Sequence, residues 1–165
     1  MLKTFATICI IGMFTSSCTS KKASRTEGSH EAEQDLTMIV GTYTSGDSKG
    51  LYSFRFNEEN GTATALSEAE VENPSYLVPS ADGKFIYAVS EFSNEQAAAN
   101  AFAFNKEEGT FRLLNTQKTG GEDPCYIITN GSNVVTANYS GGSISVFPID
   151  KDGSLLPASE VVKFK

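Results

Sequence analysis

The chain has 165 residues with 13 basic and 20 acidic side chains, a formal net charge of −7, three cysteines and one histidine. This acidic balance argues against nucleic acid as a partner, because phosphate contacts require clustered lysines and arginines. No group of His, Cys or carboxylate residues has the spacing of metal ligands, so neither a metal nor another cofactor is predicted.

The first 18 residues, MLKTFATICIIGMFTSSC, have the pattern of a signal peptide. Lys3 is followed by an apolar stretch that is shorter than the ~20 residues that a membrane-spanning helix needs. Small residues then lead to Cys18, which resembles a bacterial lipobox cysteine that becomes lipidated. An ordinary secretory signal with an incidental cysteine is the alternative. Either way we expect an exported protein, held at the membrane by a lipid anchor only in the lipobox case.

Residues 19–36, TSKKASRTEGSHEAEQDL, contain almost no apolar side chains. Such a segment cannot bury enough surface to offset the entropy of ordering it, so a flexible tether is predicted. His30 lies inside this segment, and we expect it to be exposed to solvent and neither catalytic nor metal-binding. The folded part is therefore predicted to begin at residue 37.

A repeat runs through the rest of the chain. Polar turns ending in Gly61, Gly109 and Gly153 follow one another at spacings of 48 and 44 residues, and Pro74 and Pro124 are 50 residues apart. Repeats of ~40–50 residues built from short strands are typical of β-propeller blades. We therefore predict an all-β fold, an incomplete β-propeller of about three blades. The predicted blades span 37–71, 75–117 and 125–162, with three strands in the first and no helix longer than two turns.

Alternating side chains within the repeat indicate which face of each strand is buried. Phe54, Phe102 and Phe147 occupy equivalent positions, and period-two alternation of this kind predicts that their face packs against a neighbouring layer. The runs FIYAVS (85–90) and NVVTAN (133–138) are apolar on both faces, as expected for central strands. Turns are predicted between the strands at 81–83 and 130–132, where Asp, Asn and Gly tolerate the backbone conformation required.

Four stretches together resemble the lactonase seven-bladed β-propeller family, whose best-known activity is that of 6-phosphogluconolactonase. They are VGTYTSGDSKGLYSF (40–54), NPSYLVPSADGKFIYAVSE (73–91), DPCYI (123–127) and TANYSGGSISVFPIDKDGSL (136–155). The resemblance implies the N-terminal portion of a seven-bladed propeller that hydrolyses a sugar lactone on its top face, near the axis. The family's histidine and arginine site positions lie in later blades, so no catalytic residue is assigned. The fragment alone is expected to be inactive.

In a propeller, the loops that join the second strand to the third and one blade to the next share one face. Five polar residues are predicted at that face, where they could orient a sugar hydroxyl or a lactone carbonyl: Asn73, Glu91, Asp123, Asn138 and Tyr139. The alternative is that they cap turns, which suits Asn73 and Asp123 because each precedes a proline.

Two further features resemble reactive groups. The pattern G-x-S-x-G at 46–50 matches a hydrolase nucleophile elbow, but a strand and not a helix follows it and no histidine lies downstream, so a loop is predicted. Cys125 lies in an apolar strand and is predicted to be a small buried residue and not a nucleophile.

Two functions from different classes therefore remain open. The first is a sugar-lactone hydrolase with a small-molecule lactone as its partner. The second is a non-catalytic exported propeller that binds a carbohydrate or a protein. The fold alone does not decide between them, because propellers carry many functions.

Overall fold

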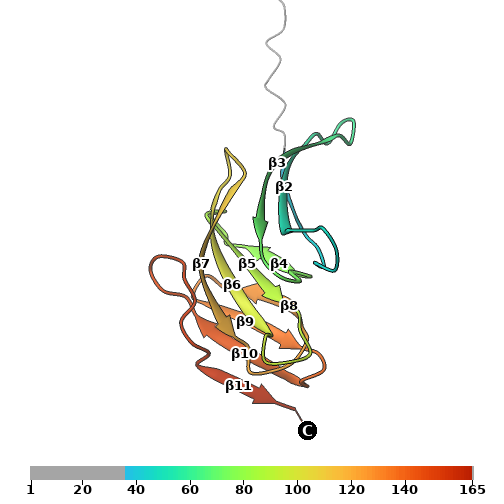
Figure 1. The fold of residues 1–165 in the computed structure, drawn as a ribbon. Coiled ribbons are helices and arrows are strands. Elements are labelled where there is room, and N and C mark those ends of the chain that lie inside the picture. The colour runs from blue at the N-terminus through green and yellow to red at the C-terminus, as the bar shows by residue number, and fades with distance from the viewer. Residues whose placement is uncertain (1–35, 165) are drawn as a thin grey trace, which may run out of the picture. The chain divides into compact units, whose positions relative to one another are not determined.

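The computed structural model describes residues 36–164 (Figure 1), so the predicted signal peptide, Cys18, His30 and the tether up to residue 35 lie outside the described residues. The described part is all β, as predicted. Within it there is no helix, and hence none long and apolar enough to cross a membrane. The strands are β1 (Leu36–Gly41), β2 (Gly50–Phe56), β3 (Ala63–Glu70), β4 (Leu77–Pro79), β5 (Phe85–Ser90), β6 (Ala98–Asn105), β7 (Thr110–Lys118), β8 (Pro124–Thr129), β9 (Asn133–Asn138), β10 (Ser143–Pro148) and β11 (Glu160–Lys163).

These strands form three antiparallel sheets in chain order: β1-β2-β3, β4-β5-β6-β7 and β8-β9-β10-β11. Each strand pairs with the next strand along the chain, so every sheet is a simple meander. The second sheet lies between the other two, because β3 lies beside β7 and β8 lies beside β4 and β5 (Figure 1). The incomplete propeller with a three-stranded first sheet is therefore confirmed. β1 begins at Leu36, one residue before the predicted boundary.

The core consists of two apolar layers, one at each junction between sheets. Between the first and second sheets lie the buried residues Leu51, Ile86, Ala88, Phe102 and Phe104. Between the second and third sheets lie Tyr87, Val89, Ala99, Ala101, Ile127, Val134, Phe147 and Leu155. Strand β5 contributes to both layers, which confirms the expectation that it is buried on both faces.

Strand β9 is different from β5. Val134 and Thr136 are buried against the second sheet, whereas Val135 and Ala137 on the other face are only half-buried. The prediction that both faces of this strand are covered was wrong for the described chain. The reason is that no sheet among residues 36–164 packs on that face of the third sheet.

The β6–β7 turn of the second sheet contacts the first sheet, and the β10–β11 connection of the third sheet contacts the second. Ser53 and Ser67 of the first sheet each donate a hydrogen bond to the Gly109 carbonyl oxygen at 2.6 Å. The buried Tyr87 of the second sheet donates to the Gly153 carbonyl at 3.1 Å. No buried side-chain nitrogen or oxygen in residues 36–164 lacks a partner, as expected for a well-packed interior.

Candidate functional site

Five connections between strands gather at one end of the sheets, and we call this end the rim. They are 42–49, 71–76, 91–97, 119–123 and 139–142. Hydrogen bonds link them in sequence from one sheet to the next: Thr44 to Asn73, Asn73 to Glu91, and Asp123 to Tyr139. The predicted meeting of Asn73, Glu91, Asp123 and Tyr139 at one end is therefore what the structure shows.

Asn73 and Asp123 occupy equivalent positions and make equivalent contacts. Both have positive φ values, 46° and 50°, in the left-handed region that Asn and Asp tolerate better than most residues. The Asn73 Oδ1 accepts hydrogen bonds from the Thr44 amide and hydroxyl, both at 3.0 Å, and its carbonyl accepts from the Glu91 amide at 3.0 Å. The Asn73 side chain therefore links the rim loops of consecutive sheets, which is a structural role.

At the second junction, the Asp123 Oδ1 accepts from the Ser93 hydroxyl at 2.7 Å and the Asp123 carbonyl accepts from the Tyr139 amide at 2.8 Å. Hydrogen bonds from Ser140 and Ser93 stabilise the charged form and lower the pKa of the Asp123 carboxyl. The two linking residues thus have similar backbone geometry, and they differ in that Asn73 is an uncharged amide and Asp123 a carboxylate.

Asn138 points into the interior and not toward the rim surface. Its side chain is 2% exposed, and its Nδ2 donates to the hydroxyls of Ser143 at 3.1 Å and Ser145 at 2.9 Å. Its Oδ1 accepts from Thr136 at 3.0 Å. The amide is therefore fully engaged in joining β9 to β10.

Glu91 is a rim carboxylate that hydroxyl groups from two other segments hold in place. Its Oε2 accepts hydrogen bonds from the Tyr43 hydroxyl at 3.0 Å and from the Ser75 hydroxyl, while its Oε1 accepts none from the described residues. The hydrogen bond to Glu91, followed by burial, raises the pKa of the Tyr43 phenol, so this phenol remains a donor at neutral pH. Three segments of chain therefore hold one half-buried carboxylate in place.

Exposed tyrosines lie at or near the rim, and one of them, Tyr43, contacts Glu91. The side chains of Tyr43 and Tyr139 are 57% and 81% exposed, and the ring centroids of Tyr76 and Tyr126 lie 4.8 Å apart on the neighbouring strand ends. Tyr76 and Tyr126 were not among the predicted site residues, although their recurrence in NPSY and DPCY was a usable signal. Tyr43 had no such signal, because it reaches Glu91 only through the fold.

Cys125 is exposed, so the prediction that it is buried was wrong. The register of β8 against β9 shifts between Pro124 and Tyr126, which leaves Cys125 as the additional residue of a β-bulge. A bulge redirects a side chain that strict alternation would place on the other face. Cys125 lies near enough to Tyr43 for its thiolate charge to raise the pKa of that phenol, as a smaller contribution than Glu91.

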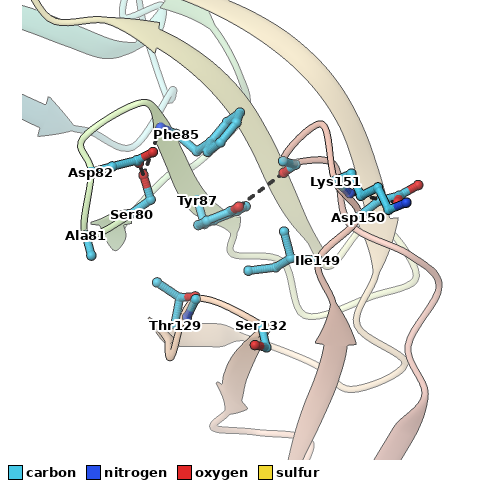
Figure 2. A pocket seen from close by; sticks show the side chains of 12 residues that line it. Ser80, Ala81, Asp82, Phe85, Tyr87, Thr129, Ser132, Ile149, Asp150 and Lys151 are labelled. Carbon is cyan, nitrogen blue, oxygen red and sulfur yellow. Dashed lines mark hydrogen bonds between the residues drawn. The ribbon is translucent and has the colours of Figure 1, made fainter.

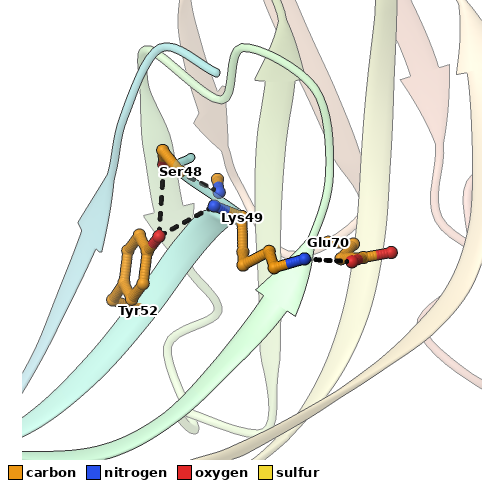
Figure 3. Close-up of polar contacts among 5 residues, drawn as sticks. Ser48, Lys49, Tyr52 and Glu70 are labelled. Carbon is orange, nitrogen blue, oxygen red and sulfur yellow. Dashed lines mark hydrogen bonds and ion pairs between the residues drawn. The ribbon is translucent and has the colours of Figure 1, made fainter. Parts of the chain in front are cut away.

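The G-x-S-x-G pattern is a loop between β1 and β2, as predicted. Figure 3 shows the Ser48 hydroxyl within the loop, where it accepts from the Tyr52 hydroxyl at 3.3 Å, and Lys49 with its ammonium 2.8 Å from Glu70. The Gly50 amide also donates to Ser48, at 3.2 Å. Ser48 therefore closes the loop and is not placed as a nucleophile.

A hollow of about 480 Å³ lies at the end of the strands opposite the rim, between the turns of the second and third sheets (Figure 2). Burial, with smaller contributions from Asp82 and Asp152, raises the pKa of Tyr87 in its floor to about 12. The Asp82 carboxylate accepts from Ser80 at 2.7 Å and so closes its own turn. No cluster of His, Cys, Asp or Glu within 36–164 is arranged to hold a metal ion.

The comparisons with known proteins agree with this architecture. The family profile described as "Lactonase, 7-bladed beta-propeller" matches residues 37–165. The chain is 38% identical over 128 residues to a 6-phosphogluconolactonase of Bacillus subtilis, an alignment that covers 73% of this chain and 36% of the relative. The chain therefore belongs to the lactonase seven-bladed β-propeller family.

Solved structures show the same relationship. A crystal structure of a proposed 6-phosphogluconolactonase from Bacteroides fragilis is 70% identical, with a TM-score of 0.80, over 82% of this chain and 38% of that one. The periplasmic gluconolactonase of Pseudomonas aeruginosa is 30% identical, with a TM-score of 0.71, over 77% of this chain and 38% of that one. The chain thus spans between about a third and two fifths of the length of these relatives.

Proposed function

We propose that the protein is a sugar-lactone hydrolase whose substrate binds at the rim. Its family membership, together with relatives named as lactonases, carries this proposal. The rim adds a chemical reason, since it presents a free carboxylate oxygen on Glu91, hydroxyl donors and exposed tyrosine rings. A few polar groups beside apolar surface form the usual composition of a small-molecule site.

Opening a lactone requires water to attack the carbonyl carbon while a base takes the proton of that water. The ring carbon–oxygen bond then breaks, the ring oxygen takes up a proton, and the product is the free hydroxy acid. Donors near the carbonyl oxygen must stabilise the negative charge that forms there. We assign no catalytic residue within 36–164, and we propose that this segment alone has no turnover.

The alternative is a non-catalytic propeller that binds a carbohydrate. The observation that favours it is the group of exposed tyrosines at the rim, because an aromatic ring offers an apolar face together with a polar tip. This function predicts binding of a sugar with no acceleration of lactone opening.

One assay separates these functions. The longest product that the gene encodes is incubated with glucono-δ-lactone, and acid release is followed above the spontaneous rate, with residues 36–165 measured in parallel. Turnover by the longest product and none by the segment is the expected result. Sugar binding without turnover would favour the alternative, and turnover by the segment alone would contradict the assignment of the catalytic groups to other parts of the protein.

We also propose that the protein is exported and lipid-anchored through Cys18, as the lipobox-like sequence suggests. A Cys18→Ala variant should move from the membrane fraction to the soluble fraction. Membrane association that is unchanged by this substitution would rule the anchor out.

A further inference from the structure

Glu91 is held at the rim without a positively charged partner. The two ion pairs within residues 36–164 join Lys49 to Glu70 and Lys84 to Asp82, so neither reaches Glu91. Its two donors, Tyr43 and Ser75, are neutral hydroxyls. Such donors orient a carboxylate without cancelling its negative charge.

The described residues around Glu91 are unfavourable for a phosphate group. Phosphate recognition generally uses arginine or lysine, or the N-terminus of a helix, and the described chain has no helix. The one lysine of the first rim loop, Lys49, is already paired with Glu70. Asp123, at the second rim junction, carries a charge of the same sign as Glu91, because hydrogen bonds lower its pKa.

The same surroundings suit a neutral polyhydroxylated ring. The free Oε1 of Glu91 can accept a hydrogen bond from a sugar hydroxyl, and such charge-assisted bonds are the stronger kind. The exposed ring of Tyr43, which is hydrogen-bonded to Glu91, offers apolar surface beside it. A sugar ring has hydroxyls at its edge and apolar C–H groups on its faces, and it therefore matches both features.

We propose that Glu91, positioned by Tyr43 and Ser75, is a specificity determinant that selects uncharged sugar lactones and disfavours phosphorylated ones. This inference rests on the proposed lactone hydrolysis and names its substrate class. Glu91 would repel a phosphate group as well as attract a sugar hydroxyl, and such a combination is a common way to build specificity. Removing one charge that faces a phosphate dianion near a protein surface changes the relative affinity by on the order of tenfold.

The first test measures kcat/KM for glucono-δ-lactone and for 6-phosphoglucono-δ-lactone with the longest product that the gene encodes. We expect the unphosphorylated lactone to be preferred, and we expect Glu91→Gln to reduce that preference about tenfold by improving the phosphorylated substrate. Glu58→Gln, which makes the same charge change in the exposed β2–β3 turn at the other end of the sheet, is the matched control and should leave the ratio unchanged. A wild-type preference for the phosphorylated lactone, or an equal effect of both substitutions, would overturn the proposal.

The second test does not depend on turnover, so it separates this inference from the proposed function. Cys125 is an exposed thiol beside Tyr43, and its alkylation rate can be measured against a Cys125→Ser variant as the blank. We expect 1,5-anhydroglucitol, a neutral ring that lacks the lactone carbonyl, to slow alkylation at a concentration at which its 6-phosphate does not. Protection by neither compound, or better protection by the phosphate, would overturn the proposal even if both lactones are hydrolysed. Protection by the neutral ring without lactone turnover would instead contradict only the proposed hydrolysis.

Discussion

The first and second sheets have nearly the same sequence pattern and yet different environments. Phe54 and Phe102 occupy equivalent positions on β2 and β6, but Phe102 is 1% exposed and Phe54 is only half-buried. The reason is that Phe102 packs on the first sheet, whereas no described sheet precedes the first one. In a repeat fold, the burial of a residue depends on its neighbouring repeat as much as on its own.

The hairpin glycines show the same contrast. Gly61 and Gly153 both have positive φ values, 72° and 87°, and so both need a glycine-like backbone. A Cβ on Gly153 would lie 2.1 Å from the Phe85 ring of the preceding sheet, whereas a Cβ on Gly61 would meet nothing within 4 Å. One glycine therefore serves the turn alone, and the other also lets two sheets approach.

The largest expected effect comes from the aromatic pair. Phe102→Ala should lower the free energy of unfolding by about 3–5 kcal/mol, because it leaves a cavity between two sheets. Phe54→Ala should cost only about 1 kcal/mol, since less of its surface is removed from water. Urea denaturation of both variants under the same conditions measures the difference. Equal losses would show that the first sheet is covered by something outside residues 36–164.

The next effect concerns the glycines. Gly61→Ala should lower the free energy of unfolding by about 1–2 kcal/mol, because alanine is strained in the left-handed conformation. Gly153→Ala should cost about 1–3 kcal/mol more, because the added methyl group overlaps the Phe85 ring. Thermal unfolding of the two variants is the measurement. If the losses caused by Gly153→Ala and Phe85→Ala simply add in the double variant, the clash with Phe85 is not the cause.

The smallest effect compares the two rim junctions. The folded pKa of Asp123 is lowered by its serine partners, so its contribution to stability is present above the unfolded value of about 3.9 and is lost as the pH falls further. In the Asp123→Asn variant, the free energy of unfolding should therefore decrease less than in the wild type as the pH falls below about 4. Asn73 is uncharged, so its contribution should be the same at every pH. Urea midpoints between pH 2.5 and pH 7 provide the test. An exposed loop carboxyl, changed in Asp47→Asn, is the control, and an identical flattening there would contradict the assignment to Asp123.

Much of this structure could be predicted from local sequence. Alternating side chains identify strands, and Gly, Asn and Asp identify the turns between them, because both signals depend only on neighbouring residues. The strands of the three sheets lie within 36–70, 77–118 and 124–163, and the equivalence of NPSY and DPCY was visible as a repeat. The lactonase family was recognisable from the same stretches.

Contacts between distant segments could not be predicted in this way. Tyr43 reaches Glu91 across 48 residues because two sheets place their loops at one end, and nothing local to either residue signals that meeting. The bulge that exposes Cys125 depends on the pairing of β8 with β9, and not on the apolar character of β8 itself. The strand pattern, the turns and the family were thus determined by the sequence alone. The tertiary structure decided which equivalent residues are buried and which polar groups remain free, because burial and hydrogen bonding between sheets depend on the neighbour that packs against each one.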